Sequence, residues 1–216
     1  AITGIRALGM KGLSVTAPHK VDVMQFLDRI DDRAHKIGAV NTIVNTGGVL
    51  MGFNTDVDGA MKALEKQTPI AQKRIVLLGA GGAARAIAFG LQEKKADVLI
   101  LNRTIQNAKE LALATHARFG DLSELDEIKK SDILIHSTSV DFSVPKEVLH
   151  KNLTVFDIRY NPKETKLILD AKKSGCMIVY GYTMLLYQAV TQFELFTGTT
   201  APVSIMEKAL LQGLKG

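Results

Sequence analysis

Residues 74–104, RIVLLGAGGAARAIAFGLQEKKADVLILNRT, predict a strand, a glycine turn, a helix and a second strand. The apolar runs 75–78 and 98–101 have the length of buried strands, and apolar side chains between them recur at helical spacing. Gly79, Gly81 and Ala84 form a G-x-G-x-x-A motif directly after the first strand. In this setting the motif favours dinucleotide binding, and the alternative is an ordinary tight turn between strand and helix.

Each small residue of this turn has a mechanical role in holding a pyrophosphate. Gly79 permits the tight turn, Gly81 lets the backbone approach the phosphates, and Ala84 allows close packing of helix on strand. The unpaired N–H groups and the positive dipole end of the helix then face the phosphates. We therefore expect cofactor contacts along the turn at Gly79, Ala80, Gly81, Gly82 and Ala83.

The end of the second strand indicates which cofactor binds. NAD enzymes usually carry Asp or Glu there, whereas this chain has Asn102, Arg103 and Thr104. A guanidinium can pair with a phosphate through two hydrogen bonds, and a hydroxyl can add a third. The sequence therefore predicts NADP, and the alternative is that Arg103 is merely an exposed residue at a strand end.

Composition excludes several classes of protein. The 216 residues carry a net charge of +5, but Lys and Arg are dispersed among Asp and Glu, which argues against nucleic-acid binding. No run of eighteen uncharged apolar residues predicts a membrane span, and no signal peptide is recognisable. The histidines lack metal-ligand spacing, so no metal is expected. Cys176 is the only cysteine, is expected to be a small buried hydrophobe, and favours a reducing, cytoplasmic location.

Predicted elements flank the nucleotide unit on both sides. The segment before it predicts a short strand, a helix, a hairpin and a second helix, at 12–16, 20–30, 42–53 and 57–66. The segment after it predicts strands at 132–135, 153–158 and 177–180, and helices at 108–114, 163–173, 184–198 and 202–214. Alternating strands and helices indicate an α/β protein with a doubly wound parallel Rossmann sheet.

The same order predicts a smaller α/β substrate lobe, completed by the C-terminal helices. We assign residues 1–56 to this lobe, 57–183 to the NADP-binding Rossmann domain, and 184–216 to helices that pack back on the substrate lobe. A cleft between two such lobes is where a substrate would meet a cofactor.

The first lobe supplies a polar set that could perform acid–base chemistry. Lys20 follows a predicted strand and Asp56 follows the predicted hairpin, and Thr16 and Asn41 belong to the same lobe. A lysine beside a carboxylate suits proton exchange with an alcohol or a carbonyl. From spacing alone, the structural interpretation is favoured for both: Lys20 as a solvated helix residue and Asp56 as the N-cap of the next helix.

Six motifs in order along the chain carry a resemblance to a known family. They are GLSVTAPHK (12–20), GAVNTI (38–43), GFNTD (52–56), GAGGAA (79–84), NRT (102–104) and GYTMLLYQA (181–189). Together they resemble the shikimate dehydrogenase family. That resemblance implies an α/β substrate lobe with a Rossmann lobe, and reduction of 3-dehydroshikimate to shikimate with NADPH on the route to chorismate and aromatic amino acids.

The resemblance also implies roles for residues. Lys20 would be the acid–base group and Asp56 its catalytic partner. Substrate hydroxyls would be held by Thr16, Asn41, Tyr160 and Gln188. Cofactor contacts beyond the glycine turn would come from Asp32, Asn102, Arg103, Thr104, Thr138, Ile158 and Gly181. Hydride would pass from the nicotinamide to the ring carbonyl while Lys20 supplies the proton.

The sequence departs from the family pattern in three places. The family's usual first strand and its Ser-x-Ser carboxylate site would precede Ala1, so this chain alone is expected to bind cofactor and to turn over poorly. Asn107 stands where the family usually has Lys or Arg, which removes one phosphate contact. His136-Ser137-Thr138 replaces the usual Asn-Ala-Thr, and Val140-Asp141-Phe142 lacks the family's glycine.

Two alternatives remain at this level. One is a relative that acts on quinate or shikimate with NAD, which Arg103 disfavours. The other is a non-catalytic nucleotide-binding module, consistent with the missing carboxylate site. The expected oligomeric state is a monomer or a homodimer. The sequence is also compatible with being the later part of a longer, bifunctional chain.

Overall fold

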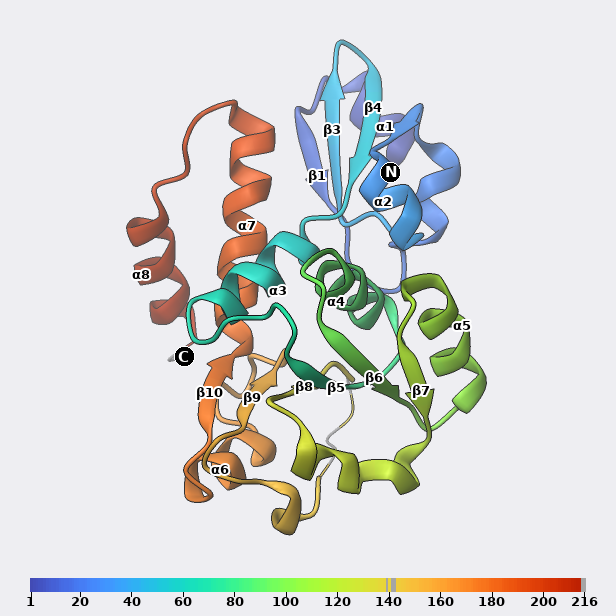
Figure 1. Ribbon diagram of the computed structural model, residues 1–216. Coiled ribbons are helices and arrows are strands. Elements are labelled where there is room, and N and C mark those ends of the chain that lie inside the picture. The colour runs from blue at the N-terminus through green and yellow to red at the C-terminus, as the bar shows by residue number, and fades with distance from the viewer. Residues whose placement is uncertain (139, 141–142, 215–216) are drawn as a thin grey trace.

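Two β-sheets organise the computed structural model, which describes residues 1–138, 140 and 143–214 (Figure 1). The larger sheet carries the glycine turn, and the smaller one is built from residues 12–53. None of the described helices combines the length and apolar composition needed to cross a membrane. Asp141 and Phe142 lie outside the described residues.

The larger sheet is wholly parallel and matches the predicted Rossmann architecture. Its strands, in the spatial order β10–β9–β8–β5–β6–β7, are Met177–Tyr180, Thr154–Asp157, Ile133–His136, Arg74–Leu78, Asp97–Leu101 and Arg118–Gly120. The strand order reverses beside β5, and ligands of such sheets bind at the carboxyl ends of the strands at that point. The glycine turn after β5 therefore occupies the expected ligand position.

Helices cover both faces of this sheet. One face packs against α3 (Asp56–Glu65), α4 (Gly82–Glu93) and α5 (Ile105–Thr115). The other packs against α6 (Lys166–Lys173) and the 3-10 segments η2 (Leu122–Lys130) and η3 (Lys146–Val148). Alternate residues of β5 enter opposite cores, as a strand buried on both faces requires.

The smaller sheet has the order β1–β3–β4–β2, from Gly12–Ser14, Thr42–Thr46, Val49–Phe53 and Arg29–Ile30. The hairpin β3–β4 is confirmed, and its turn places Gly47 and Gly48 at φ of 59° and 90°, which glycine adopts without strain. Helices α1 (Ile2–Ala7) and α2 (Asp32–Ile37) lie beside this sheet (Figure 1).

The last two helices connect the two sheets. In Figure 1, α7 (Gly181–Thr197) begins directly after β10 and extends toward β1 of the smaller sheet, with α8 (Val203–Gly213) packed beside it. Gly12 of β1 lies so near Phe196 of α7 that a Cβ there would be 2.2 Å from its ring. The end of α7 therefore packs on the smaller sheet.

The predicted helix over 20–30 is wrong. The chain forms only a short 3-10 segment, η1 (Asp22–Phe26), and then the strand β2. Asp28 explains the change: its N–H donates to the carbonyl of Leu50 at 3.0 Å, and its carboxylate accepts from the N–H of Leu50 at 2.7 Å. Pairing with β4, distant in sequence, overrides the local helical period.

Other elements escaped the sequence prediction, among them α1, α2, β7, η2 and η3. The sequence does carry cap signals for α2, namely Asp31 before it and Gly38 after it. In the structure the Asp31 side chain accepts from the N–H groups of Arg33 and Ala34, and Gly38 ends the helix at φ 72°. Its six residues are too few for apolar periodicity to be visible. Cys176 is buried just before β10, as expected.

Candidate active site between the two lobes

Lys20 and Asp56 form a close ion pair beside the smaller sheet. Lys20 Nζ lies 2.5 Å from Asp56 Oδ2, and the two side chains are 20% and 9% exposed. The carbonyl of Lys20 accepts from the N–H of Val40 at 2.8 Å, which holds the lysine backbone against the residues leading into β3. The pair is therefore held from both sides and is partly shielded from water.

Asp56 is the first residue of α3 and not its N-cap, because Thr55 occupies that position. Its N–H donates to Asn54 Oδ1 at 3.1 Å. Its other carboxylate oxygen, Oδ1, accepts a hydrogen bond from Asn41 Nδ2 at 2.9 Å. The carboxylate is thus oriented by Asn41 on one oxygen and by Lys20 on the other, near the positive end of a helix that favours its charge.

Asn41 is buried and fully engaged. Its Oδ1 accepts from the N–H of Thr55 at 2.8 Å and from the hydroxyl of Thr42 at 2.7 Å. Its amide also donates to Gln188 Oε1 of α7 at 3.5 Å. Asn41 therefore links the acid–base pair to the C-terminal helix.

The cleft that contains this pair has a volume of about 380 Å³ and draws its walls from both lobes. The smaller lobe supplies Ser14, Val15, Thr16, Lys20, Asn41 and Asp56, and the larger lobe with α7 supplies Ala83, Ile158, Tyr160, Gly181, Met184, Leu185, Gln188 and Gln192. All the predicted catalytic and substrate-binding residues line this one cleft. A small polar molecule placed there would face an ammonium, a carboxylate and several amides and hydroxyls.

Ser14 and Gln192 were missed by the sequence prediction. Gln192 is buried, accepts from the Ser14 hydroxyl at 2.9 Å, and donates to the Thr42 hydroxyl at 2.9 Å and to the Asn41 carbonyl at 3.3 Å. One signal existed: Gln188 and Gln192 are four residues apart on a helix and so share a face. Gln192 ties α7 to β1 and β3.

The glycine turn leaves space where a phosphate would lie. Gly79 has φ 111°, and a Cβ there would be 2.8 Å from Ser137 Oγ, so this position requires glycine. Gly81 is the N-cap of α4, and a Cβ on it would meet nothing within 4 Å. A pocket of about 310 Å³ follows the turn, lined by Gly79, Ala80, Gly81, Gly82, Ala83, Asn102, Ser137 and Thr138.

A neighbouring pocket of about 370 Å³ lies at the end of β6, where Asn102, Arg103, Thr104, Asn107 and Thr138 are among its lining residues. Asn102 Nδ2 donates to the carbonyl of Thr104 at 2.9 Å and so closes the local turn. Arg103 is exposed, and no other described residue pairs with its guanidinium. An uncommitted cation at the mouth of this pocket is available to an anionic ligand.

Asp32 is the one predicted cofactor residue that the structure keeps apart. It is the first residue of α2 and lines neither the cleft nor the two pockets at the glycine turn. Within the described part of the chain, no group of three or more His, Cys, Asp or Glu residues is placed to hold a metal ion.

A buried charged group lies at the ends of β8 and β9. Burial alone would raise the pKa of Asp157, but hydrogen bonds from His136, Arg159 and Thr165 lower that pKa to about 2. The carboxylate therefore stays ionised in a fully enclosed position, where an unpaired charge would be very costly.

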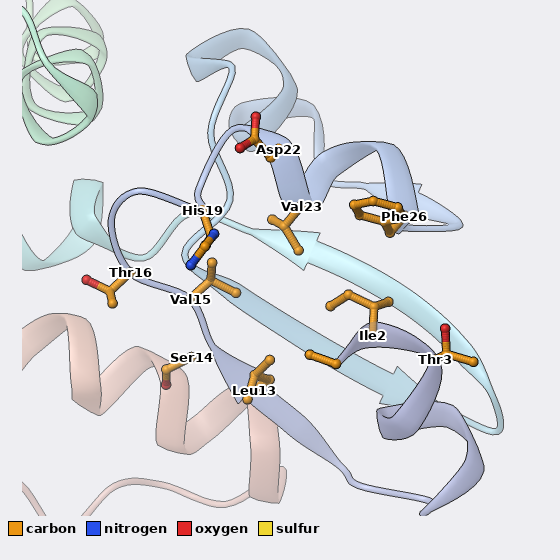
Figure 2. A pocket seen from close by; sticks show the side chains of 11 residues that line it. Ile2, Thr3, Leu13, Ser14, Val15, Thr16, His19, Asp22, Val23 and Phe26 are labelled. Atoms are coloured by element: carbon orange, nitrogen blue, oxygen red, sulfur yellow. The ribbon is translucent and has the colours of Figure 1, made fainter.

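A further cavity lies against β1 and the residues that follow it, between side chains of the segments 1–3, 13–19 and 22–26 (Figure 2). It measures about 470 Å³ and is lined mainly by apolar side chains, including Ile2, Leu13, Val23 and the half-exposed Phe26. Ser14, Val15 and Thr16 line both this cavity and the cleft. The two hollows therefore share one wall.

Three family models match successive parts of the chain. They describe a shikimate dehydrogenase substrate binding domain (residues 1–43), a shikimate/quinate 5-dehydrogenase (residues 61–170) and a shikimate 5'-dehydrogenase C-terminal domain (residues 181–211). Their order follows the small lobe, the Rossmann sheet and α7 with α8. The matched ranges contain all the residues that line the cleft except Asp56, which lies between the first two of them.

Individual proteins give the same result. The chain is 43% identical to a shikimate dehydrogenase (NADP(+)) of Pyrococcus abyssi, over 99% of this chain and 83% of that protein. A crystal structure of a shikimate dehydrogenase in complex with NADP+ superposes with a TM-score of 0.91 at 38% identity, over 99% of this chain and 80% of that one. The Thermus thermophilus enzyme in complex with NADP(H) and shikimate superposes with a TM-score of 0.91 at 32% identity, over 98% of this chain and 82% of that one.

The identities and the structural superpositions both extend over nearly the whole chain. The chain therefore belongs to the shikimate dehydrogenase family, the NADP-dependent oxidoreductases that interconvert 3-dehydroshikimate and shikimate.

Proposed function

We propose that Lys20 and Asp56 are the acid–base pair of an NADPH-dependent reduction of 3-dehydroshikimate to shikimate, a step of aromatic amino acid biosynthesis. The observation that carries the proposal is the 2.5 Å contact between Lys20 Nζ and Asp56 Oδ2 in a cleft that the nucleotide lobe also lines. A half-buried ammonium is suited to donate a proton to a developing alkoxide.

The cofactor supplies the hydride when it is bound, and the protein supplies orientation. The N-terminus of α4 and the glycine turn hold the pyrophosphate, since their N–H groups and helix dipole favour an anion. Asn102, Arg103 and Thr104 would hold the phosphate on the adenosine ribose. Ile158 and Gly181, which border the cleft, would lie along the nicotinamide.

Lys20 protonates the carbonyl oxygen of the substrate as hydride arrives at its carbon. Asp56 holds the ammonium at the cleft, and Asn41 keeps Asp56 in place. Thr16, Tyr160 and Gln188 line the same cleft and are suited to hold substrate hydroxyls. In the reverse direction, the neutral amine of Lys20 accepts the hydroxyl proton of shikimate.

Domain roles follow from these contacts. Residues 1–56 form the substrate lobe, 57–183 the NADP-binding domain, and 184–216 the helices that complete the substrate lobe. The Gln192 hydrogen bonds and the contact of Phe196 with Gly12 support this division. Cys176 has a free thiol, which suits a cytoplasmic location. The proposed oligomeric state is a monomer or a homodimer.

The test measures initial rates of the purified chain with shikimate or quinate and with NADP or NAD. The proposal expects the highest kcat/KM with shikimate and NADP. A higher kcat/KM with quinate and NAD would mean that the chain is a quinate dehydrogenase instead. Binding of NADPH without turnover of either substrate would indicate a nucleotide-binding module instead.

A further inference from the structure

The buried pair His136–Asp157 lies between the two halves of the cofactor site and has no part in the reaction described above. Both side chains are fully buried, at the carboxyl ends of the adjacent strands β8 and β9. His136 Nδ1 lies 3.1 Å from Asp157 Oδ1. A histidine and an aspartate enclosed together at the ligand-binding edge of a parallel sheet are more than packing, since apolar side chains would fill the same space at lower cost.

On one side the pair reaches the nucleotide pockets through Thr138. His136 Nε2 lies 2.7 Å from Thr138 Oγ1, and that hydroxyl lies 3.1 Å from the carbonyl of Val140. Thr138 lines both the pocket along the glycine turn and the pocket beside Arg103. The methyl group of Thr138 also faces Gly79, where a Cβ would approach it to 3.0 Å. The position of Thr138 therefore affects the shape of both pockets.

On the other side the pair reaches the cleft through the residues that follow β9. Asp157 Oδ1 accepts from the N–H of Arg159 at 3.1 Å, and Oδ2 accepts from the hydroxyl of Thr165 at 2.7 Å. The residues on either side of Arg159 are Ile158 and Tyr160, which line the cleft containing Lys20. Asp157 thus fixes the backbone that carries the nicotinamide side of the site.

The proton count on Thr138 links the two sides. Its hydroxyl has one proton, while both His136 Nε2 and the Val140 carbonyl lie within hydrogen-bond distance. The His136 ring and the Val140 carbonyl therefore both lie within reach of this hydroxyl, and the ring is placed to orient it.

We infer that His136 and Asp157 are positioning residues for the cofactor, which hold the Thr138 hydroxyl and the 158–160 backbone in one geometry. Neither side chain lines the cleft or the two nucleotide pockets, so the pair acts through Thr138 and the backbone after β9. This inference rests on the proposed function for the identity of the ligand, a nicotinamide dinucleotide phosphate. It adds residues that the six family motifs do not include.

The experiment uses His136→Leu, which removes both ring nitrogens, and His136→Gln, which keeps a polar group. The control is His150→Leu, because His150 lies outside the two nucleotide pockets and the cleft, and its Nε2 is buried with no partner among the described residues. The chain contains no tryptophan, so NADPH fluorescence gives a direct binding titration. Kinetic constants and melting temperatures are measured on the same samples.

For His136→Leu we expect the Kd for NADPH and the KM for NADP to rise about tenfold, the effect of losing one buried hydrogen bond to a charged or polar partner. The KM for shikimate changes less than the constants for the cofactor, since Lys20, Asn41 and Asp56 are untouched and Tyr160 alone of the proposed substrate contacts lies in residues 158–160. His136→Gln recovers part of the loss, and His150→Leu binds NADPH as the unmodified chain does. A lower melting temperature with an unchanged Kd in His136→Leu would overturn the inference.

A double-mutant cycle with Thr138→Val separates positioning from general damage. If His136 acts through Thr138, then His136→Leu raises the Kd much less in the Thr138→Val background than in the unmodified chain. Fully additive effects would overturn the inference. Failure of the unmodified chain to bind NADPH would overturn the proposed function, whereas equal binding by the unmodified chain and His136→Leu would overturn this inference alone.

Discussion

Gly59 of α3 lies directly against Met184 of α7: a Cβ on Gly59 would be 2.6 Å from the Met184 carbonyl oxygen and 3.0 Å from the Gln188 backbone nitrogen. Both neighbours are backbone atoms of a helix, so neither can rotate away. The contact brings Gln188 beside Asn41, to which it is joined at 3.5 Å. The absence of a side chain at Gly59 therefore determines how closely α7 approaches the cleft.

Gly59→Ala is expected to destabilise the protein although alanine favours helices. Displacing α7 costs about 2 kcal/mol, as overpacking of a core usually does. The melting temperature falls by about 5 °C, and the KM for shikimate rises because Gln188 moves. Thermal unfolding and steady-state kinetics measure the two effects. Gly4→Ala in α1 is the control, since a Cβ there meets nothing within 4 Å. Equal melting temperatures for Gly59→Ala and the unmodified chain would contradict the expected crowding.

Lys20→Ala is expected to lower kcat by about 10²–10⁴-fold, the usual contribution of acid–base catalysis. The Kd for NADPH stays nearly constant, because Lys20 lies on the small lobe and the phosphates lie on the large one. Stopped-flow rates and NADPH titration measure these quantities, with the exposed Lys11→Ala as the control. An unchanged rate would remove Lys20 from the mechanism.

Arg103→Ala is expected to raise the KM for NADP by about tenfold or more and to change the KM for NAD little. The reason is that the uncommitted guanidinium pairs with the phosphate that only NADP carries. Lys109→Ala on α5 removes one exposed charge from the same lobe and serves as the control. Parallel increases for both cofactors would mean that Arg103 does not distinguish them.

The buried Asp157 carboxylate predicts a specific sensitivity to acid. Its pKa is about 2 in the folded chain, below its ordinary value of 3.8, so its contribution to stability is fully present above about pH 4. That contribution is lost as the pH falls from 4 through 2. Asp157→Asn is therefore less stable at pH 7 but loses less stability between pH 7 and pH 3 than the unmodified chain does.

Urea unfolding at pH 7, 4 and 3 measures this difference. Asp126→Asn is the control, because Asp126 is an exposed partner of Lys129 and its removal leaves the buried group intact. Identical pH profiles for Asp157→Asn and the unmodified chain would show that this carboxylate does not carry the acid sensitivity.

Local signals were strong for the Rossmann sheet. Residues 75–78 and 98–101 are continuous apolar runs, and the glycine turn requires conformations that few other residues adopt, so both could be predicted from neighbours in sequence. The hairpin around Gly47 and Gly48 was predicted for the same reason. The prediction of a helix over 20–30 failed because Asp28 pairs with Leu50. A partner twenty-two residues away cannot be predicted from the local sequence pattern.

The sequence by itself determined the dinucleotide turn, the cation at Arg103 and, through six ordered motifs, the family of the protein. Only the tertiary structure decided that Lys20 and Asp56 meet at 2.5 Å, that Gln192 binds Ser14 across 178 positions of sequence, and that His136 and Asp157 enclose each other. The physical reason is one of range. Turns, caps and strands are set by residues close in the chain, whereas an active site is made by side chains that packing brings together from distant segments.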